Sequence, residues 1–327
     1  MTRTLRSRLV AGALTAALLV LAAVALAVGD YRLSLGQVLA GLGGSAGFDS
    51  VVVLEWRLPR VTACVAFGAA LGLAGALFQT ITRNPLGSPD IIGFASGAYT
   101  GVIVATTVLG GTLATATGGA LVGGLATALV IYLLAYRDGV QGFRLIIVGV
   151  GVTAMLHAVN AWLLLRAQVE VAMSAAIWGN GSLSLAGWPD VGPALGVLAA
   201  ALPLVAAANR PLRQLELGDD AAAAHGVRVE PARLAIIGLG ILLTAVVTAA
   251  TGPIAFVALA APQIARRLAA APGIPLTHAA LTGSFVLLGA DLIAQHLPPN
   301  PVPVGVVTVV LGGAYLLSLL VREARRP

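Results

Sequence analysis

The sequence contains no lysine, so all 19 basic residues among its 327 are arginines. A P-loop holds the phosphates of a nucleotide with the lysine of a Gly-x4-Gly-Lys-Ser/Thr motif. Because that motif cannot exist here, ATP hydrolysis by this route is excluded for the chain. Transport driven by ATP through a P-loop would therefore need an ATPase on another polypeptide.

Charged residues are also scarce, at 10% of the chain, whereas soluble domains carry roughly 25%. Hydrophobic residues make up 58%, and the mean hydropathy is +0.96. Such a chain cannot cover a water-facing surface, and its apolar runs approach the ~20 residues that a membrane-spanning helix needs. We therefore predict an all-α integral membrane protein, formed as a single transmembrane domain over residues 1–327. The formal charge of +6 fits membrane orientation better than nucleic-acid binding, because the arginines lie in short loops between apolar runs.

Residues for redox or metal chemistry are few. The one cysteine, Cys64, lies in an apolar run, where a buried and inert thiol is expected. The four histidines are scattered and match no metal-ligand spacing. We therefore predict no metal site, no cofactor bound by this chain and no enzymatic activity.

Ten apolar runs predict about ten transmembrane helices. They cover residues 9–28, 59–81, 92–109, 113–136, 145–165, 191–208, 234–250, 254–265, 279–293 and 304–321. The first run also resembles a secretory signal peptide, but its length favours an uncleaved first helix. The eighth run is short and contains Pro262, so it is either a full span or a broken helix enclosed by protein.

The arginines predict the orientation of these helices. With the N-terminus in the cytoplasm, most arginines fall on the cytoplasmic side, where basic residues of membrane proteins concentrate. Ten spans then place both termini in the cytoplasm. The two longest polar stretches become an external segment over 29–57, with an amphipathic piece at 33–42, and a cytoplasmic loop over 209–233.

The predicted spans hold very few ionisable groups, chiefly His157 and Asp291, with Gln79 and Asn160 as neutral polar companions. Ion-coupled carriers bind and release the driving ion through charged residues at mid-membrane. The scarcity of such residues argues against a secondary transporter and favours a structural role for Asp291. Energy for transport must then come from a partner.

The cytoplasmic loop carries a pattern for a short, capped helix. Pro211 is expected to start the segment, Gly218-Asp219-Asp220 to supply an N-cap with acidic residues in the first turn, and Gly226 to end the helix. A rigid helix between two spans would be a lever for a cytosolic subunit. An ordinary solvated loop explains the pattern equally well.

Two further segments could face a partner or a passageway. In Arg57-Leu-Pro-Arg60, Pro59 suits the first turn of a helix, so both guanidinium groups could point outward from one face toward carboxylates on a partner. Snorkelling of these arginines to lipid headgroups is the alternative. The stretch over 83–97 is rich in proline and glycine, which fits either backbone beside a passageway or simple turn chemistry.

Together these motifs resemble the permease subunits of the FecCD type, the membrane part of bacterial ABC importers for iron–siderophore complexes and vitamin B12. The resemblance spans the chain and is carried, in order, by Arg57-Leu-Pro-Arg60, Gly75-Ala-Leu-Phe-Gln79, Arg83-Asn-Pro-Leu-Gly-Ser-Pro-Asp90, Leu215-Glu-Leu-Gly-Asp-Asp220, Gly252-Pro-Ile-Ala-Phe256, Ala261-Pro-Gln-Ile-Ala-Arg266, Ala290-Asp291 and Pro303-Val-Gly-Val-Val-Thr308. It implies the permease fold of the type II, vitamin B12-importer-like ABC importers. Three further segments most resemble the ferric enterobactin permeases, which implies a catecholate-type ferric siderophore as cargo: Phe143-Arg-Leu-Ile-Ile147, Asn160-Ala-Trp-Leu-Leu-Leu165 and Gly312-Gly-Ala-Tyr-Leu-Leu317.

The resemblance also implies roles for matching residues. Arg57 and Arg60 would dock acidic residues of an external substrate-binding protein. The coupling element on an ATP-binding cassette subunit would comprise Leu217, Gly218, Asp219, Asp220, Ala221, Ala224 and Gly226. The candidates for a pathway or gate at the interface with a second permease are Gln79, Asn84, Pro85, Ser88 and Asn160. The assembly implied is two permeases, alike or merely similar, with two ATPase subunits that bind ATP and Mg²⁺, in the cytoplasmic membrane of a bacterium.

Alternatives and departures accompany this prediction. A cobalamin or haem importer of the same family is one alternative, and an ion-coupled secondary transporter is another. Many relatives have arginine at Gln295, glutamate at Pro301 and histidine at Gln263. The first two departures suggest that one docking charge is supplied by the partner permease, whereas the third has no consequence that the sequence explains.

Overall fold

The computed structural model describes residues 3–44, 47–90, 93–108, 113–136 and 142–324, and no strand occurs within these ranges. The described helices are α1 (Arg3–Ala27), α2 (Leu35–Leu42), α3 (Phe48–Val51), the π-helical segment η1 (Val52–Arg57), α4 (Leu58–Thr82), α5 (Phe94–Thr107), α6 (Leu113–Ala135), α7 (Gly142–Arg166), α8 (Val169–Gly179), α9 (Trp188–Glu216), α10 (Asp219–Ala224), α11 (Val229–Thr251), α12 (Val257–Ala269), α13 (Leu276–His296) and α14 (Val304–Ala324). The prediction of an all-helical protein is confirmed.

Seven of the described helices are long and apolar enough to cross a membrane. They are Leu5–Ala27, Phe48–Thr82, Thr115–Ala135, Gly142–Arg166, Trp188–Glu216, Val229–Thr251 and Leu276–His296. The other three predicted spans correspond to α5 with 14 residues, α12 with 13, and α14, whose described apolar part is Val304–Ser318. The multi-pass architecture is therefore confirmed, but the count of ten is not. The two ends of the predicted span 92–109 lie outside the described residues.

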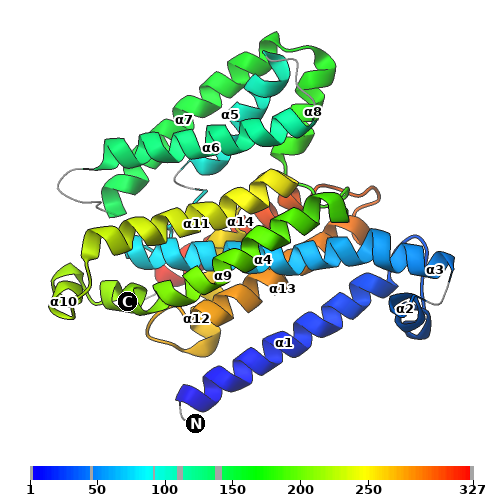
Figure 1. Cartoon of the computed structure of the whole chain (residues 1–327), viewed down its shortest axis with the longest axis horizontal. Helices are drawn as coiled ribbons and strands as arrows, with labels where there is room; N and C mark the ends of the chain where they lie inside the picture. Colours follow the sequence, from blue (N-terminus) through cyan, green and yellow to red (C-terminus); the bar gives the residue numbers. More distant parts are fainter. Residues whose placement is uncertain (1–2, 45–46, 91–92, 109–112, 137–141, 325–327) are drawn as a thin grey trace.

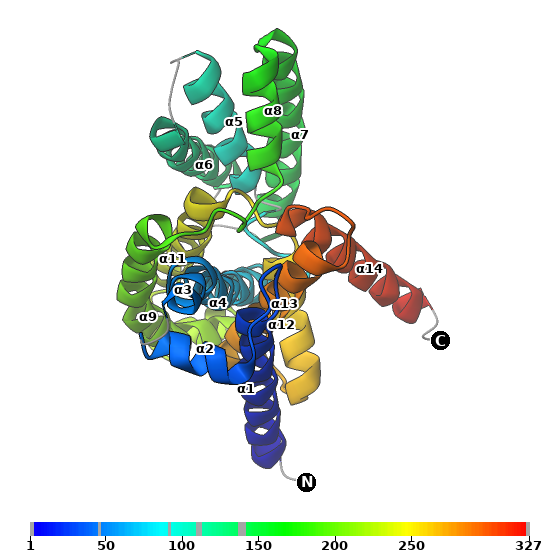
Figure 2. The ribbon, with the colours of Figure 1, turned by 90° about the vertical axis from the view of Figure 1, so that its right-hand side faces the viewer.

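The centre of the bundle is α4, which Figure 2 shows enclosed by α9, α11, α12 and α13. Glycines on α4 make this possible, because small residues let membrane helices approach closely. A Cβ added at Gly68 would lie 2.5 Å from the carbonyl oxygen of Gly283, and one added at Gly72 would lie 2.2 Å from that of Ala279. At Gly75 the nearest atom is the carbonyl oxygen of Ala258, at 1.7 Å.

We expect Gly75→Ala to destabilise the protein because its new methyl group has no room at the contact between α4 and α12. Overpacking of this kind costs about 1–3 kcal/mol or more, since backbone rather than a flexible side chain must move. Thermal unfolding of the purified protein measures the effect. Gly238→Ala in α11 is the matched control, because no atom lies within 4 Å of the added Cβ. Equal melting temperatures for the two variants would contradict this account of the crossing.

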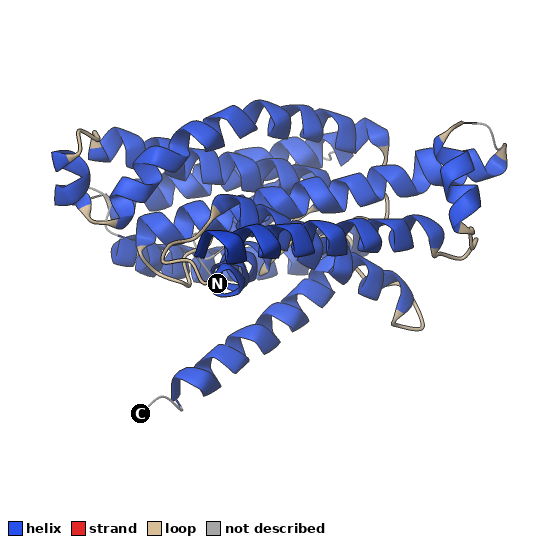
Figure 3. Cartoon of the chain, turned by 90° about the horizontal axis from the view of Figure 1, so that it is seen from below, coloured by secondary structure: helices blue, strands red, loops and turns tan. Residues whose placement is uncertain are grey.

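The helices α5, α6, α7 and α8 form a group on one side of α11 (Figure 1). The sequence analysis assigned no helix between residues 165 and 191, yet α8 lies there, begun by Gln168 in an extended conformation. In α7 only 11% of the most apolar window is buried. The helix α14 also extends away from the bundle toward the C-terminus (Figure 3), so α7 and α14 both leave apolar faces uncovered.

Two predicted boundaries were wrong. The external segment 29–57 contains the expected amphipathic helix, α2, whose N-terminus is closed by a capping box of Ser34 and Gln37, but its last ten residues are helical and continuous with α4. Pro211 does not start a segment, because α9 continues through it to Glu216. Long membrane helices tolerate proline when neighbouring helices and polar groups compensate for the lost hydrogen bond. The loop 209–233 is thereby reduced to α10 and its two short connections.

Candidate functional site

A cavity of about 550 Å³ opens between α7, the start of α12 and the connection from α4 to α5. Its walls are mostly apolar, and its lining residues are Leu86, Ser88, Asp90, Val150, Thr153, Ala154, His157, Ala255, Phe256, Leu259 and Leu316. The uncovered faces of α7 and α14 flank it, since Val150 and Leu316 belong to these helices. A cavity of this size with few polar groups would not bind a solute tightly.

Polar atoms without a partner line this cavity. The hydroxyls of Ser88 and Thr153 and the Oδ2 atom of Asp90 are buried and have no hydrogen-bond partner among the described residues. Thr153 and His157 lie one turn apart on α7, so both can face the same space. Buried polar groups are normally paired, and these atoms are therefore available to a solute, to water or to another subunit.

The carboxyl group of Asp90 is in the connection between α4 and α5, where burial raises its pKa to about 6 despite a hydrogen bond from the Phe256 backbone N–H. The native state therefore holds this proton more tightly than the unfolded chain, whose pKa is near 3.8. Stability is lost as pH rises through this window, because the charged form is the disfavoured one in the native protein.

We expect Asp90→Asn to raise the melting temperature above that of the unaltered protein at pH 8, and this difference to shrink as pH falls from 6 toward 4. Asparagine can still accept the hydrogen bond from Phe256 but carries no charge. A difference that is constant from pH 4 to pH 8 would show that Asp90 is not disfavoured as an anion.

The predicted pathway residues lie in three places. Ser88 lines the cavity, and Asn84 and Pro85 form the turn that leads to it, where the Asn84 side-chain oxygen accepts a hydrogen bond from the Leu86 N–H at 2.9 Å. Gln79 is buried between α4 and α12, and its amide donates to the carbonyl oxygen of Leu259 at 2.9 Å. Asn160 is 2% exposed, and its side-chain amide has no partner in the described part of the chain.

The structure gives a role to Gln263, which the sequence did not explain. Its Nε2 donates to the Oε1 atom of Gln79 at 2.5 Å, and its Oε1 accepts from Arg266 at 3.2 Å. These three side chains form a polar chain through the contact between α4 and α12. Hydrogen bonds between helices fasten membrane bundles, so Gln79 here has the geometry of a packing residue rather than of a cavity wall.

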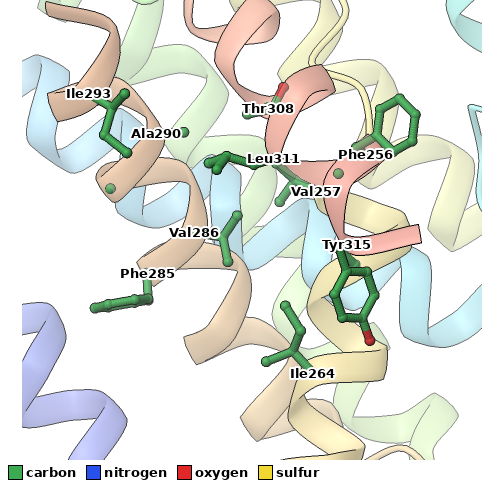
Figure 4. Close-up of a pocket in the computed structure, with 13 residues that line it drawn as sticks. Phe256, Val257, Ile264, Phe285, Val286, Ala290, Ile293, Thr308, Leu311 and Tyr315 are labelled. Atoms are coloured by element: carbon green, nitrogen blue, oxygen red, sulfur yellow. The ribbon is translucent and has the colours of Figure 1, made fainter. Parts of the chain in front are cut away.

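A second cavity of about 230 Å³ lies where α14 diverges from α12 and α13 (Figure 4). Figure 4 shows Val286 and Ile293 of α13 facing Leu311 and Tyr315 of α14 across it. The hydroxyl of Thr308 on its wall already donates to the Gly305 carbonyl. This groove is apolar and contains none of the predicted site residues.

The two predicted docking arginines are bound within the protein rather than pointing outward from one face. Arg57 donates from Nη1 to the carbonyl oxygens of Leu26 at 2.7 Å and Ala27 at 3.2 Å, and from Nη2 to that of Tyr31. It therefore fastens the end of α1 to the start of α4. The turn after α1 folds back over Arg57, so the two guanidinium groups do not both point outward from one face; their docking role stays a prediction.

Arg60 forms a two-pronged ion pair with Asp291 of α13. Its Nε lies 2.9 Å from Oδ2 and its Nη2 lies 2.8 Å from Oδ1. Gln295, one turn along α13, donates to the same Oδ2 at 2.5 Å. This pair fits the structural role predicted for Asp291, and Gln295 adds a neutral donor to the shared carboxylate.

The helix α10 protrudes at the opposite end of the bundle from α2 and α3 (Figure 1). Glycines bound it as expected, with positive φ values of 121° at Gly218 and 81° at Gly226. Ala222 is fully buried, whereas Leu217 and Asp220 are exposed, so the helix has one face on the protein and one free. Of the two interpretations that the sequence left open, the structure has the short helix, over Asp219–Ala224, and no side chain caps its N-terminus.

Two arginines bind the first acidic residue of α10. Asp219 accepts from Arg83 at 2.7 Å and from Arg233 at 2.7 Å, and Arg233 also contacts Glu230 at 2.6 Å. Partial burial disfavours the charged Asp219 carboxylate, but the hydrogen bonds and charges of Arg233 and Arg83 outweigh it and lower its pKa. Asp219 is therefore an anion throughout the physiological pH range.

Comparison with known proteins decides the class of this chain. The profile of the FecCD transport family matches residues 17–322. The chain belongs to the FecCD transport family. The chain is thus a membrane permease of the ABC importer kind and not an enzyme.

Individual relatives agree with this membership. The chain is 49% identical over 300 residues to the ferric enterobactin transport system permease protein FepG of Escherichia coli, which covers 91% of each protein. It is 36% identical to the achromobactin transport system permease protein CbrC of Dickeya dadantii, over 94% of this chain and 90% of that one. A metal-chelate type ABC transporter solved in an inward-facing conformation matches 97% of this chain and 99% of its own, with a TM-score of 0.83 and 27% identity.

Within this FecCD permease, sequence reasoning missed several site residues. Asp90 and Thr153 line the cavity, and the only available signals were the position of Asp90 in a polar stretch and the four-residue spacing from Thr153 to His157. Arg83 had appeared only as part of a longer motif and Arg233 only as a charge in the cytoplasmic loop, so neither was predicted to bind Asp219. Their pairing with Asp219 joins segments up to 136 residues apart, and no local pattern reports such a contact.

Proposed function

We propose that this chain is the membrane-spanning permease subunit of an ATP-driven importer that carries a ferric siderophore of the catecholate, enterobactin-like type across the bacterial cytoplasmic membrane. The observation that carries the proposal is the protruding helix α10 on a bundle that has no P-loop of its own. The 49% identity to a ferric enterobactin permease supports the class of cargo. A cobalamin or haem importer of the same family is the alternative cargo assignment.

The proposed assembly follows from the uncovered surfaces. A second, similar permease would cover the apolar faces of α7 and α14, closing the cavity into a passage between the subunits. Two ATP-binding cassette subunits would supply ATP and Mg²⁺ and hold α10, while a substrate-binding protein would dock at the end that carries α2 and α3. The chain itself would bind no cofactor.

The proposed topology has ten spans, with α5, α12 and α14 completing the seven long ones. The α10 end then faces the cytoplasm, because Arg83, Arg210, Arg213, Arg228 and Arg233 gather near it. Both termini would be cytoplasmic. In this orientation Arg57 and Arg60 lie at the external end of α4.

We expect Arg57 to contribute to docking through the positive charge that it adds to the external end, since its hydrogen bonds are already used within the chain. The charge of Arg60 is balanced by Asp291, so its contribution to docking would be smaller. Arg57→Gln removes one charge and leaves the ion pair of Arg60 in place. We expect this variant to weaken the binding protein's affinity several-fold, more at low salt than at high salt. Unchanged affinity at low salt, in a complex that remains folded, would remove Arg57 from the docking surface.

Reconstitution in liposomes tests the function. The permease is combined with a second permease, the ATPase pair and a binding protein loaded with an iron-55 catecholate complex. Uptake should require ATP on the α10 side and should persist when ion gradients are collapsed. Uptake that survives ATP depletion, or accumulation by this polypeptide alone, would overturn the proposal; transport of cobalamin or haem instead of the catecholate would favour the alternative cargo.

A further inference from the structure

The last turn of α4 ends in an unusual backbone conformation at Arg83. This residue has φ of 49°, in the left-handed region that side-chain-bearing residues rarely adopt. Hydrogen bonds fix the turn, from the Arg83 N–H to the Thr80 carbonyl at 3.2 Å and from the Asn84 N–H to the Gln79 carbonyl at 3.2 Å. The Asn84 side chain then caps the N–H of Leu86. The direction in which the chain leaves α4 is therefore well determined.

The side chain of Arg83 joins this turn to α10. One nitrogen, Nη2, donates to Asp219 Oδ1 at 2.7 Å and to the carbonyl oxygen of Leu215 at 3.0 Å. Leu215 is in the last turn of α9, directly before α10. Arg83 thus contacts both the start of α10 and the end of α9, the helix that precedes it.

The same turn continues into the wall of the larger cavity. Leu86, Ser88 and Asp90 follow Arg83 within seven positions, and all three line the cavity. Within this segment the Gly87 N–H donates to the carbonyl oxygen of Asn84 at 2.9 Å. A displacement of Arg83 therefore acts on a short, hydrogen-bonded segment at the cavity rather than on a slack loop.

The other carboxylate oxygen of Asp219, Oδ2, accepts from Arg233, which is far more buried than Arg83. Arg233 is 7% exposed, lies in the first turns of α11 and also contacts Glu230 of the same helix. Asp219 is thus shared between a buried arginine of a long helix and a half-exposed arginine on a turn. If α10 moves, we therefore expect the turn that bears Arg83 to move with it, while the buried Arg233 and helix α11 stay in place.

We propose that Arg83 is a positioning residue through which a displacement of α10 moves the cavity-lining segment 84–90. This rests on the proposed function, since an ATPase partner must move α10. Both Arg83 and Asp219 are nearly half exposed, at 49% and 46%, and exposed ion pairs of this kind add little to stability. Losing the pair should therefore leave the fold intact while it breaks the mechanical link.

The chain offers a clean reporter for this motion. Its only cysteine, Cys64, is fully buried, so a cysteine introduced at Leu86, which is 47% exposed, is the one that reacts with a hydrophilic maleimide. The assembled transporter bearing Leu86→Cys is labelled without nucleotide and with ATP plus vanadate. ATP hydrolysis is measured on the same samples. The two labelling rates give the nucleotide-dependent movement of the cavity wall.

We expect the ratio of the two rates to fall by about fivefold or more when Arg83→Gln is added, which matches the smaller couplings measured between linked sites. ATP hydrolysis should continue, because Arg83 lies outside any nucleotide site. Arg83→Lys, which keeps the charge, should restore part of the ratio. Arg267→Gln is the control, since Arg267 is exposed in the last turn of α12 and stacks on Tyr315 instead of contacting α10.

A ratio that is unchanged in Arg83→Gln would overturn the proposal, as would equal losses in Arg83→Gln and Arg267→Gln. If the proposed function itself is wrong, the labelling experiment gives a different result. In that case the rates would not depend on nucleotide even when Arg83 is present.

Discussion

Replacing Asp291 with alanine should lower the free energy of unfolding of this permease by about 3–5 kcal/mol, the cost found when one partner of a buried ion pair is removed. The Asp291 side chain is 3% exposed, and Arg60 is 18% exposed. Without the carboxylate, Arg60 would keep its charge beside apolar helices, and Gln295 would also lose its acceptor. The midpoint of thermal unfolding of the purified protein measures this loss.

A second variant separates the lost pair from the stranded charge. Arg60→Ala combined with Asp291→Ala removes both charges, so we expect it to be more stable than Asp291→Ala alone. Glu170→Ala is the control for removal of an acidic residue, because Glu170 is exposed in the first turn of α8. A double variant that is as unstable as the sum of the two single variants would show that Arg60 and Asp291 do not act as a pair.

The sequence predicted α10 well because its signals are local. Gly218 and Gly226 adopt the positive φ values that favour glycine, and the acidic residues fall in the first turn as the helix dipole prefers. The apolar runs likewise located the long helices, since a span needs about 20 apolar residues whatever surrounds it. Structural features that depend only on a short stretch of the sequence could therefore be predicted.

Boundaries and pairings depend on distant neighbours, and here the sequence failed. Pro211 suggested a helix start, but α9 passes through it to Glu216. Arg57 and Arg60 looked free, yet their partners are the end of α1 and Asp291, the latter 231 residues away. The periodicity of one helix cannot report which residue of another helix faces it. Gln263 gained its explanation only when its contact with Gln79 was visible.

We expect Asp219→Arg to reduce the number of substrate molecules imported per ATP hydrolysed by about tenfold, within the range of measured couplings between sites. The new guanidinium would lie between Arg83 and Arg233, where it repels both. Arg233 is almost fully buried and cannot turn to water, so α10 must move away from α11. The ATPase partner would then move a helix that is no longer fixed to α4 or α11.

Asp220→Arg is the matched comparison, because it makes the same charge change one residue along the same helix. Asp220 is exposed, and within the described residues it forms no ion pair with the two arginines that hold Asp219. Reversing the charge of Asp220 should lower the number of substrate molecules imported per ATP only a few-fold, because it affects only the helix dipole and the contact with the ATPase. If α10 acted on the ATPase only through its surface charge, Asp219→Arg and Asp220→Arg would lower the number of substrate molecules imported per ATP equally. A larger loss at Asp219 than at Asp220, with ATP hydrolysis retained in both, is the result that requires the link from Asp219 to α4 and α11.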